Sequence, residues 1–115
     1  FGQTLLQQGQ WQGEQVIPAS AVASISGGGD PAKFAGAGYT TLPGGSYRSQ
    51  WWALHNDNGA YSARGIHGQA IYIDPVAEMV IARFATFPIS FNAAIDPTSL
   101  PAYQAVADYL MGKAY

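Results

Sequence analysis

The sequence predicts an α+β fold in which helices flank an antiparallel sheet of three to four strands. Two observations carry this prediction: residues 47–84 hold several short strand-like runs separated by turn signals, and helix-like segments precede and follow them. Short turns join antiparallel strands, whereas parallel strands need long crossovers. The 115 residues, 48% of them hydrophobic and with a net charge of −2, are enough for one globular domain with a core of its own.

Two helices are expected in residues 1–26. The run from Phe1 to Gly9 is typical of the last turns of a helix that ends in a left-handed glycine. No capping residue stands ahead of Phe1, so we expect the chain to be the C-terminal portion of a larger protein that supplies the start of this helix. A tight turn at Trp11–Gln15 then leads to a second helix over Ala19–Ile25.

Residues 27–46 are rich in Gly, Pro and Thr and have a period of neither 2 nor 3.6 residues, which predicts a loop. A loop of that length is unusual inside a compact domain. Two interpretations stay open: an active-site loop, or a segment draped over parts of a larger protein, which we prefer.

The strands are expected in residues 47–84. The run Tyr47–His55 is rich in aromatic residues and Ala60–Arg64 returns antiparallel to it. Between them, Asn58 and Gly59 form a strong hairpin signal because both residues tolerate positive φ.

A second pair of strands follows. Gln69–Ile73 runs into the turn signal of Asp74 and Pro75, and Met79–Phe84 runs back. The nearly unbroken apolar character of Met79–Phe84 predicts burial on both faces of that strand.

A C-terminal helix is expected in residues 99–112, capped by Ser99, spanning Leu100–Met111 and stopped by Gly112. Helical spacing predicts a buried stripe on it, made of Tyr103, Val106, Ala107 and Leu110.

Composition excludes several partners. Five Lys and Arg against seven Asp and Glu, without a basic run, argue against nucleic acid, and no apolar stretch reaches the length of a membrane span. Without Cys, and with only His55 and His67 as isolated imidazoles, we expect neither a metal nor another cofactor. The composition leaves the cytoplasm and the periplasm equally open as compartments.

No catalytic serine is recognisable. None of the serines stands in Gly-x-Ser-x-Gly or Ser-x-x-Lys, the two spacings that place a base beside the nucleophile. The lysines, Lys33 and Lys113, follow Asp30 and Leu110 by three residues instead. If the chain serves an enzyme, the nucleophile lies elsewhere.

The run from Arg64 to Gln69 is the candidate site. It holds Gly65 and Gly68 at the entry to a strand, and glycine at such a place often marks the close approach of a ligand. A free backbone N–H there is able to stabilise an oxyanion. The alternative is an ordinary bulge at a sheet edge. Of the neighbouring Trp51 and Trp52, which point to opposite faces of a strand, at most one lines a pocket.

These residues resemble a known family. The segments that carry the resemblance are Phe1–Leu6 to Gly9, Trp11–Gly13, Gln15–Ala19, Tyr47–Trp52 and Gly65–Pro75. Together they are similar to the serine β-lactamase-like hydrolases, which include class C β-lactamases, DD-peptidases and family VIII esterases, and within that group to the 6-aminohexanoate-dimer hydrolase branch. The resemblance covers nearly the whole chain; it is specific in Gly65–Pro75 and generic in the helices. It implies that the chain is the C-terminal part of the α/β domain of a β-lactamase/transpeptidase-like fold.

The resemblance also implies a Ser-x-x-Lys nucleophile and a Tyr-containing second motif outside this chain, and a third motif inside it. One alignment sets the third motif at Ala63–Gly65 and makes the backbone N–H of Ile66 the oxyanion donor. A rival alignment sets it at His67–Gln69 and makes Ala70 the donor. Neither keeps the lysine of this motif, which puts turnover of β-lactams in doubt.

As substrate-binding residues the resemblance implies Trp52, as a pocket wall, with Arg64, Gly65 and His67 beside it. His67 is expected to position or pack neighbouring groups rather than act as a base.

The predicted function is that of a segment of a serine hydrolase that cleaves small amides or esters through an acyl-enzyme. The substrates expected are 6-aminohexanoate-oligomer-like amides, esters or β-lactam-type compounds. The partner expected is the remainder of the hydrolase domain, and the 115 residues alone are expected to be inactive. A catalytically inactive penicillin-binding-like or ligand-binding relative is the alternative, and a stand-alone β module is a third.

Overall fold

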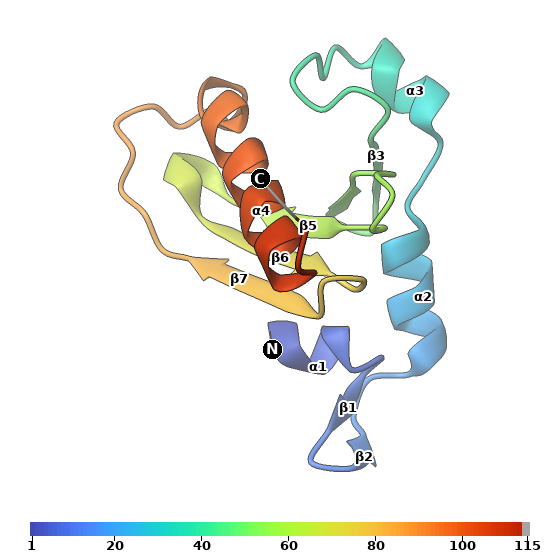
Figure 1. Ribbon diagram of the computed structural model, residues 1–115. Helices are drawn as coiled ribbons and strands as arrows, with labels where there is room; N and C mark the ends of the chain where they lie inside the picture. Colours follow the sequence, from blue (N-terminus) through green and yellow to red (C-terminus); the bar gives the residue numbers. More distant parts are fainter. Residues whose placement is uncertain (114–115) are drawn as a thin grey trace.

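The computed structural model describes residues 1–113 as an antiparallel sheet with helices on both faces (Figure 1). The five strands of the sheet lie side by side in chain order and comprise β3 (Ser46–Arg48), β4 (Trp51–Ala53), β5 (Tyr61–Arg64), β6 (Ala70–Asp74) and β7 (Met79–Arg83). The predicted antiparallel sheet with flanking helices is confirmed. The sheet has five strands, however, and not three to four.

The additional strand arises from a hairpin that the sequence does not signal. The expected strand Tyr47–His55 is divided into β3 and β4 at Ser49 and Gln50, which both take positive φ, 51° and 69°. Two successive residues with positive φ form the tight turn that matches the twist of a hairpin, a turn usually made by Asn and Gly.

The loop between β4 and β5 spans residues 54–60. Gly59 takes the expected positive φ of 65°. Asn58 has another role, because its side chain is buried and donates from Nδ2 to Oδ2 of Asp74 at 2.8 Å. The Asp74 carboxylate also accepts from the N–H of Ala77 at 2.9 Å, so one buried acid holds two turns together.

The first face of the sheet is covered by the N-terminal helices. α1 (Gly2–Leu6) packs on β6 and β7, and α2 (Ala19–Gly27) packs on β4. A small hairpin of β1 (Gln10–Trp11) and β2 (Glu14–Gln15) joins the two helices where a turn was expected. The core on this face is made of Leu5, Val22, Trp51, Tyr61 and Ile73.

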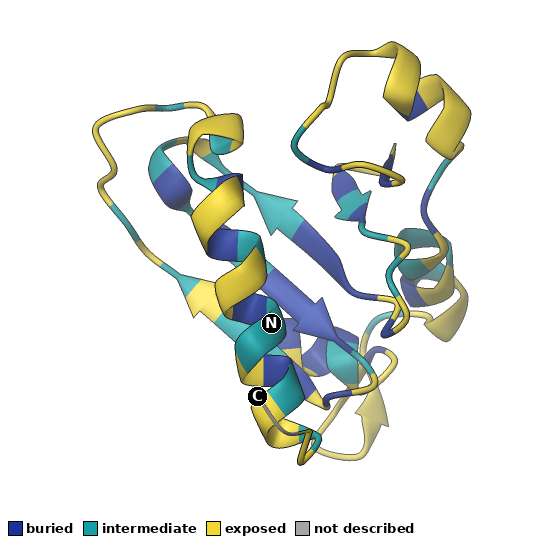
Figure 2. Cartoon of the chain, turned by 45° about the horizontal axis from the view of Figure 1, so that its top comes forward, coloured by how far each residue is buried: buried dark blue, intermediate teal, exposed yellow. Residues whose placement is uncertain are grey.

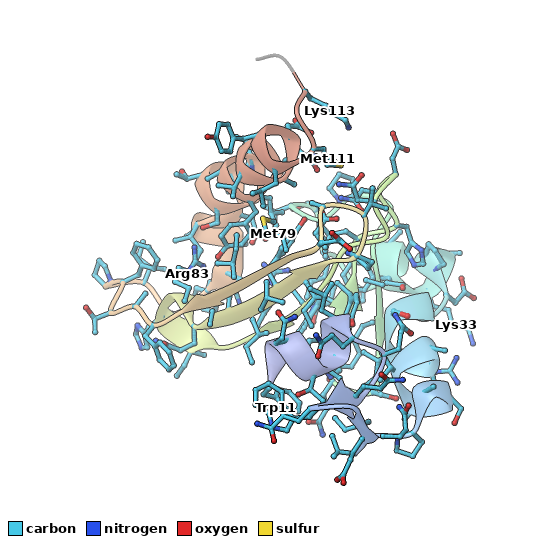
Figure 3. The ribbon with its side chains drawn as sticks, turned by 60° about the horizontal axis from the view of Figure 1, so that its bottom comes forward. Trp11, Lys33, Met79, Arg83, Met111 and Lys113 are labelled. Carbon is cyan, nitrogen blue, oxygen red and sulfur yellow. The ribbon has the colours of Figure 1, made fainter. Side chains whose placement is uncertain are left out.

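The second face is covered by α4 (Asp96–Leu110), which lies across the sheet in Figure 1. Its buried side points to the sheet and its outer side is exposed, as Figure 2 shows. Met79 lies between the sheet and this helix (Figure 3). The core here is made of Ala60, Tyr72, Ala77, Met79, Tyr103 and Ala107.

The predicted details of α4 are partly wrong. The helix begins at Asp96, so Ser99 lies inside it, where it is buried and accepts from Arg83 at 2.6 Å instead of capping the helix. Tyr103 and Ala107 are buried as expected. Val106 and Leu110 are 46% and 54% exposed, because the buried stripe follows Asp96, Ser99, Tyr103 and Ala107.

Two further expectations need correction. The predicted loop 27–46 contains the helix α3 (Pro31–Gly36), capped by Asp30, whose carboxylate accepts from the N–H of Ala32 at 2.9 Å. β7 has α1 on one face and the core beneath α4 on the other, but as an edge strand it is only partly buried, and within it only Met79 is fully buried. Within residues 1–113, no helix combines the length and apolar character needed to cross a membrane.

Candidate active site

The glycine-flanked run after β5 forms a closed loop. The N–H of Gly65 donates to the carbonyl of Gln69 at 2.8 Å, and between them the chain makes the 3-10 turn η1 (Ile66–Gly68). His67 takes a left-handed conformation with φ 56° and ψ 24°. The loop therefore leaves Ile66 67% exposed at its tip.

Hydrogen bonds from residues 85–90, the segment after β7, hold this loop in place. The side-chain amide of Gln69 bonds both backbone groups of Ala85, donating to its carbonyl and accepting from its N–H at 3.1 Å. Two backbone bonds of His67 add to this, one to Ser90 and one from Phe87 at 3.1 Å. The His67 ring also bonds the Phe87 carbonyl through Nδ1 at 2.7 Å, an arrangement that positions the loop.

Gly68 is required by this packing. Its φ is +90°, and a Cβ added to it would lie 2.1 Å from the ring of Phe87. Any larger residue would push the Phe87 ring away and open the loop.

Backbone directions distinguish the two expected oxyanion donors. Since the Gln69 carbonyl points to β5, the N–H of Ala70 points the other way, to Arg83 in β7. Within residues 1–113, the N–H of Ile66 has no hydrogen-bond partner.

Two cavities open beside the loop. The larger one, of about 770 Å³, is lined by Trp52, Arg64 and Gly65 together with residues of α1, β6 and β7. The smaller one, of about 380 Å³, is lined by Trp52, Arg64 and Ile66 together with residues from 38–41 and 90–96. Four of the five predicted site residues thus meet at these two cavities. His67, whose ring bonds the Phe87 carbonyl, lines neither.

Trp52 forms a wall common to both cavities. Its ring packs edge-on against Tyr47 at 4.8 Å between centroids and under the guanidinium of Arg64 at 5.7 Å. Its Nε1 is buried and has no hydrogen-bond partner within the described residues. Trp51, on the opposite face, is in the core against Tyr61 at 5.6 Å.

An ion pair that the sequence does not reveal lies against this wall. The guanidinium of Arg64 donates to Oδ1 of Asp96, and both side chains are less than 10% exposed. The hydroxyl of Thr41 donates to Oδ2 of Asp96 at 2.6 Å. Asp96 followed by Pro97 is a helix-start signal that would have located this acid, had the helix been expected to begin there.

The two histidines have separate hydrogen-bond partners. His55 bonds Ser46 and His67 bonds Phe87, and no cluster of three His, Cys, Asp or Glu side chains occurs among residues 1–113.

Comparison with known proteins gives relatives in sequence and in structure. No family model matches the chain. A 6-aminohexanoate-dimer hydrolase of Paenarthrobacter ureafaciens is 35% identical over 88 residues, which is 76% of this chain and 22% of that protein. A solved structure from Bacillus anthracis, provisionally named a 6-aminohexanoate-dimer hydrolase, matches with a TM-score of 0.82 and 34% identity. That match covers all of this chain and 28% of the other.

The chain therefore spans about a quarter of the length of these relatives. The predicted resemblance is confirmed: in sequence and in fold, this chain is similar to part of proteins named 6-aminohexanoate-dimer hydrolases.

Proposed function

We propose that this chain forms one wall of the active site of a serine hydrolase that cleaves small amides or esters through an acyl-enzyme. The observation that carries the proposal is the unpartnered N–H of Ile66 at the edge of a cavity walled by Trp52. A fixed backbone N–H of this kind stabilises the negative charge that develops on a carbonyl oxygen during acyl transfer.

Ile66 is the donor in this proposal, and Ala70 is not. The N–H of Ala70 is directed into the ladder with β7, so it is not free to meet a substrate. The Ile66 N–H belongs to a loop whose far end is held by Gln69 and by residues 85–90, which limits its movement. A fixed donor needs no reorganisation during the reaction, which is the source of its catalytic effect.

The charges around the smaller cavity favour an uncharged group at the bond that is cleaved. Arg64 is neutralised by Asp96, and the third-motif lysine expected to meet the carboxylate of a β-lactam is absent. Together with the names of the two relatives, this makes the 6-aminohexanoate dimer and simple esters the first substrates to test.

The nucleophile belongs, in this proposal, to a Ser-x-x-Lys segment outside these 115 residues. The chain holds no such motif, and the family resemblance implies one. The 115 residues alone are therefore expected to show no hydrolysis, and the rest of the hydrolase domain is the partner that completes the site.

Covalent labelling tests the proposal. A fluorophosphonate probe is added to the protein that carries this chain and, separately, to the 115 residues alone, and peptide mass spectrometry locates the label. Labelling of one serine outside this chain, with none on the 115 residues alone, is the expected result. Absence of labelling, with retained binding of an amide, would support the catalytically inactive relative instead.

A further inference from the structure

The Arg64–Asp96 ion pair connects the two parts of the proposed site. Arg64 is the last residue of β5 and directly precedes Gly65 and Ile66. Its guanidinium also lies over the ring of Trp52 at 5.7 Å. The side chain of Arg64 therefore touches the cavity wall, and its backbone leads into the loop that carries the free N–H.

Asp96 fixes this cation from α4, which covers the face of the sheet on which the Arg64 side chain lies. It is the first residue of α4, it is 4% exposed, and its two carboxylate oxygens have separate partners, Arg64 and the hydroxyl of Thr41. A carboxylate with both oxygens engaged in a buried position has little freedom to rotate. α4 and the segment around Thr41 thus meet at the Arg64 guanidinium.

We propose that Asp96 is a positioning residue which, by holding the Arg64 guanidinium against Trp52, sets the direction of the Ile66 N–H. This inference rests on the proposed function. Without Asp96 the guanidinium would be buried without a counter-charge and would move toward water, taking the end of β5 with it. Small displacements of an oxyanion donor are sufficient to slow the reaction, because the donor must point at the oxygen where charge develops.

The test uses the protein that carries this chain, with the substitutions Asp96→Asn and Thr41→Val. The first keeps the shape of Asp96 and removes its charge, and the second removes the hydrogen bond from Thr41 while keeping its volume. Asp57→Asn is the matched control, since Asp57 is an exposed acid in the loop after β4. Thermal melting, followed by circular dichroism, establishes that each variant is folded.

Two substrates separate positioning from general stability: a p-nitrophenyl ester and its thionoester, in which sulfur replaces the carbonyl oxygen. Sulfur accepts hydrogen bonds weakly, so the ratio of kcat for ester over thionoester reports on the oxyanion donors. For Asp96→Asn we expect kcat for the ester to fall about 10- to 100-fold, with KM little changed and the ratio lowered. Thr41→Val should give a smaller change in the same direction, and Asp57→Asn none.

The inference is overturned if folded Asp96→Asn keeps the wild-type kcat, or loses kcat with the ester-to-thionoester ratio unchanged. If Asp96→Asn does not fold, the same ratio in Thr41→Val decides the matter. Failure of the proposed function itself is recognised separately, because the wild-type protein would then not be acylated by either substrate.

Discussion

The hydroxyl of Ser46 and Nε2 of His55 lie 2.6 Å apart, with the serine fully buried and the imidazole at the surface. Ser46 Oγ also accepts from the N–H of Gly29 at 2.9 Å. Gly28 packs so closely here that an added Cβ would lie 2.4 Å from this Oγ. One serine in β3 therefore joins the end of α2 to the loop after β4.

Replacing Ser46 by Ala should lower the free energy of unfolding by about 1 to 3 kcal/mol, because the Gly29 N–H is left without its acceptor. Urea unfolding of the chain measures the change. Ser20→Ala, at an exposed position of α2, is the control and should stay within about 0.5 kcal/mol of wild type. Equal stability of the two variants would show that the contact contributes nothing.

Ile66→Pro should remove the proposed oxyanion donor with little change elsewhere. Gly65 has φ −107° and ψ 171°, the extended conformation that a residue before proline adopts, so the substitution is compatible with the backbone. In the protein that carries this chain we expect kcat to fall about 100- to 1,000-fold. Ile66→Ala keeps the N–H and should retain most of the activity. Equal losses in both variants would assign the effect to the side chain.

Replacement by Phe should affect substrate binding at Trp52 and stability at Trp51. Trp52→Phe removes a buried N–H without a partner, so the stability should remain within about 1 kcal/mol while KM for an amide substrate rises. Trp51→Phe leaves space in the core beside Tyr61 and should lower the free energy of unfolding by about 1 to 3 kcal/mol. Urea unfolding and substrate kinetics measure the two effects. If Trp52→Phe lowers the stability as much as Trp51→Phe does, the Trp52 ring belongs to the core and does not act as a cavity wall.

Stability should fall at alkaline pH. Burial raises the pKa of Tyr61 to about 12, and burial with the nearby Asp74 charge raises the pKa of Tyr72 to about 12. In the unfolded chain a tyrosine loses its proton near pH 10, whereas in the folded chain Tyr61 and Tyr72 keep theirs to about pH 12. Their contribution to the free energy of unfolding is therefore complete below about pH 10 and is lost as the pH rises toward 12. We expect a loss of about 2 to 4 kcal/mol between these limits, measured by urea unfolding. Tyr61→Phe should show a shallower dependence, and an equal slope would contradict the assignment.

Strand positions were predictable from the sequence where side-chain patterns determine them. β6 and β7 follow apolar runs with a strong turn between them, and both lie within one residue of the predicted bounds. The turn at Ser49 and Gln50 was not predictable, because neither residue type usually takes positive φ and the conformation is imposed by pairing of β3 with β4.

The candidate site divides in the same way. Gly65, Gly68 and the aromatic strand were recognisable, since glycine at a strand entry has a clear structural meaning. The contacts of Asp96 with Thr41 and Arg64 were not, because they join residues 55 and 32 positions apart, and no local pattern encodes such a contact. The direction of the Ala70 amide likewise depends on strand register, and that of the Ile66 amide depends on the turn between β5 and β6.

The order of the strands has a consequence for how the chain folds. Each strand of the sheet pairs with the one made just before it, so every pairing closes a short loop and has a small entropic cost. The helices come from opposite ends of the chain, and each buries one face of the finished sheet. The hairpins are therefore expected to form early, and the slower step is the docking of α1 and α4. The positioning of Arg64 by Asp96 would then be among the last contacts to form, so the site is completed only when folding ends.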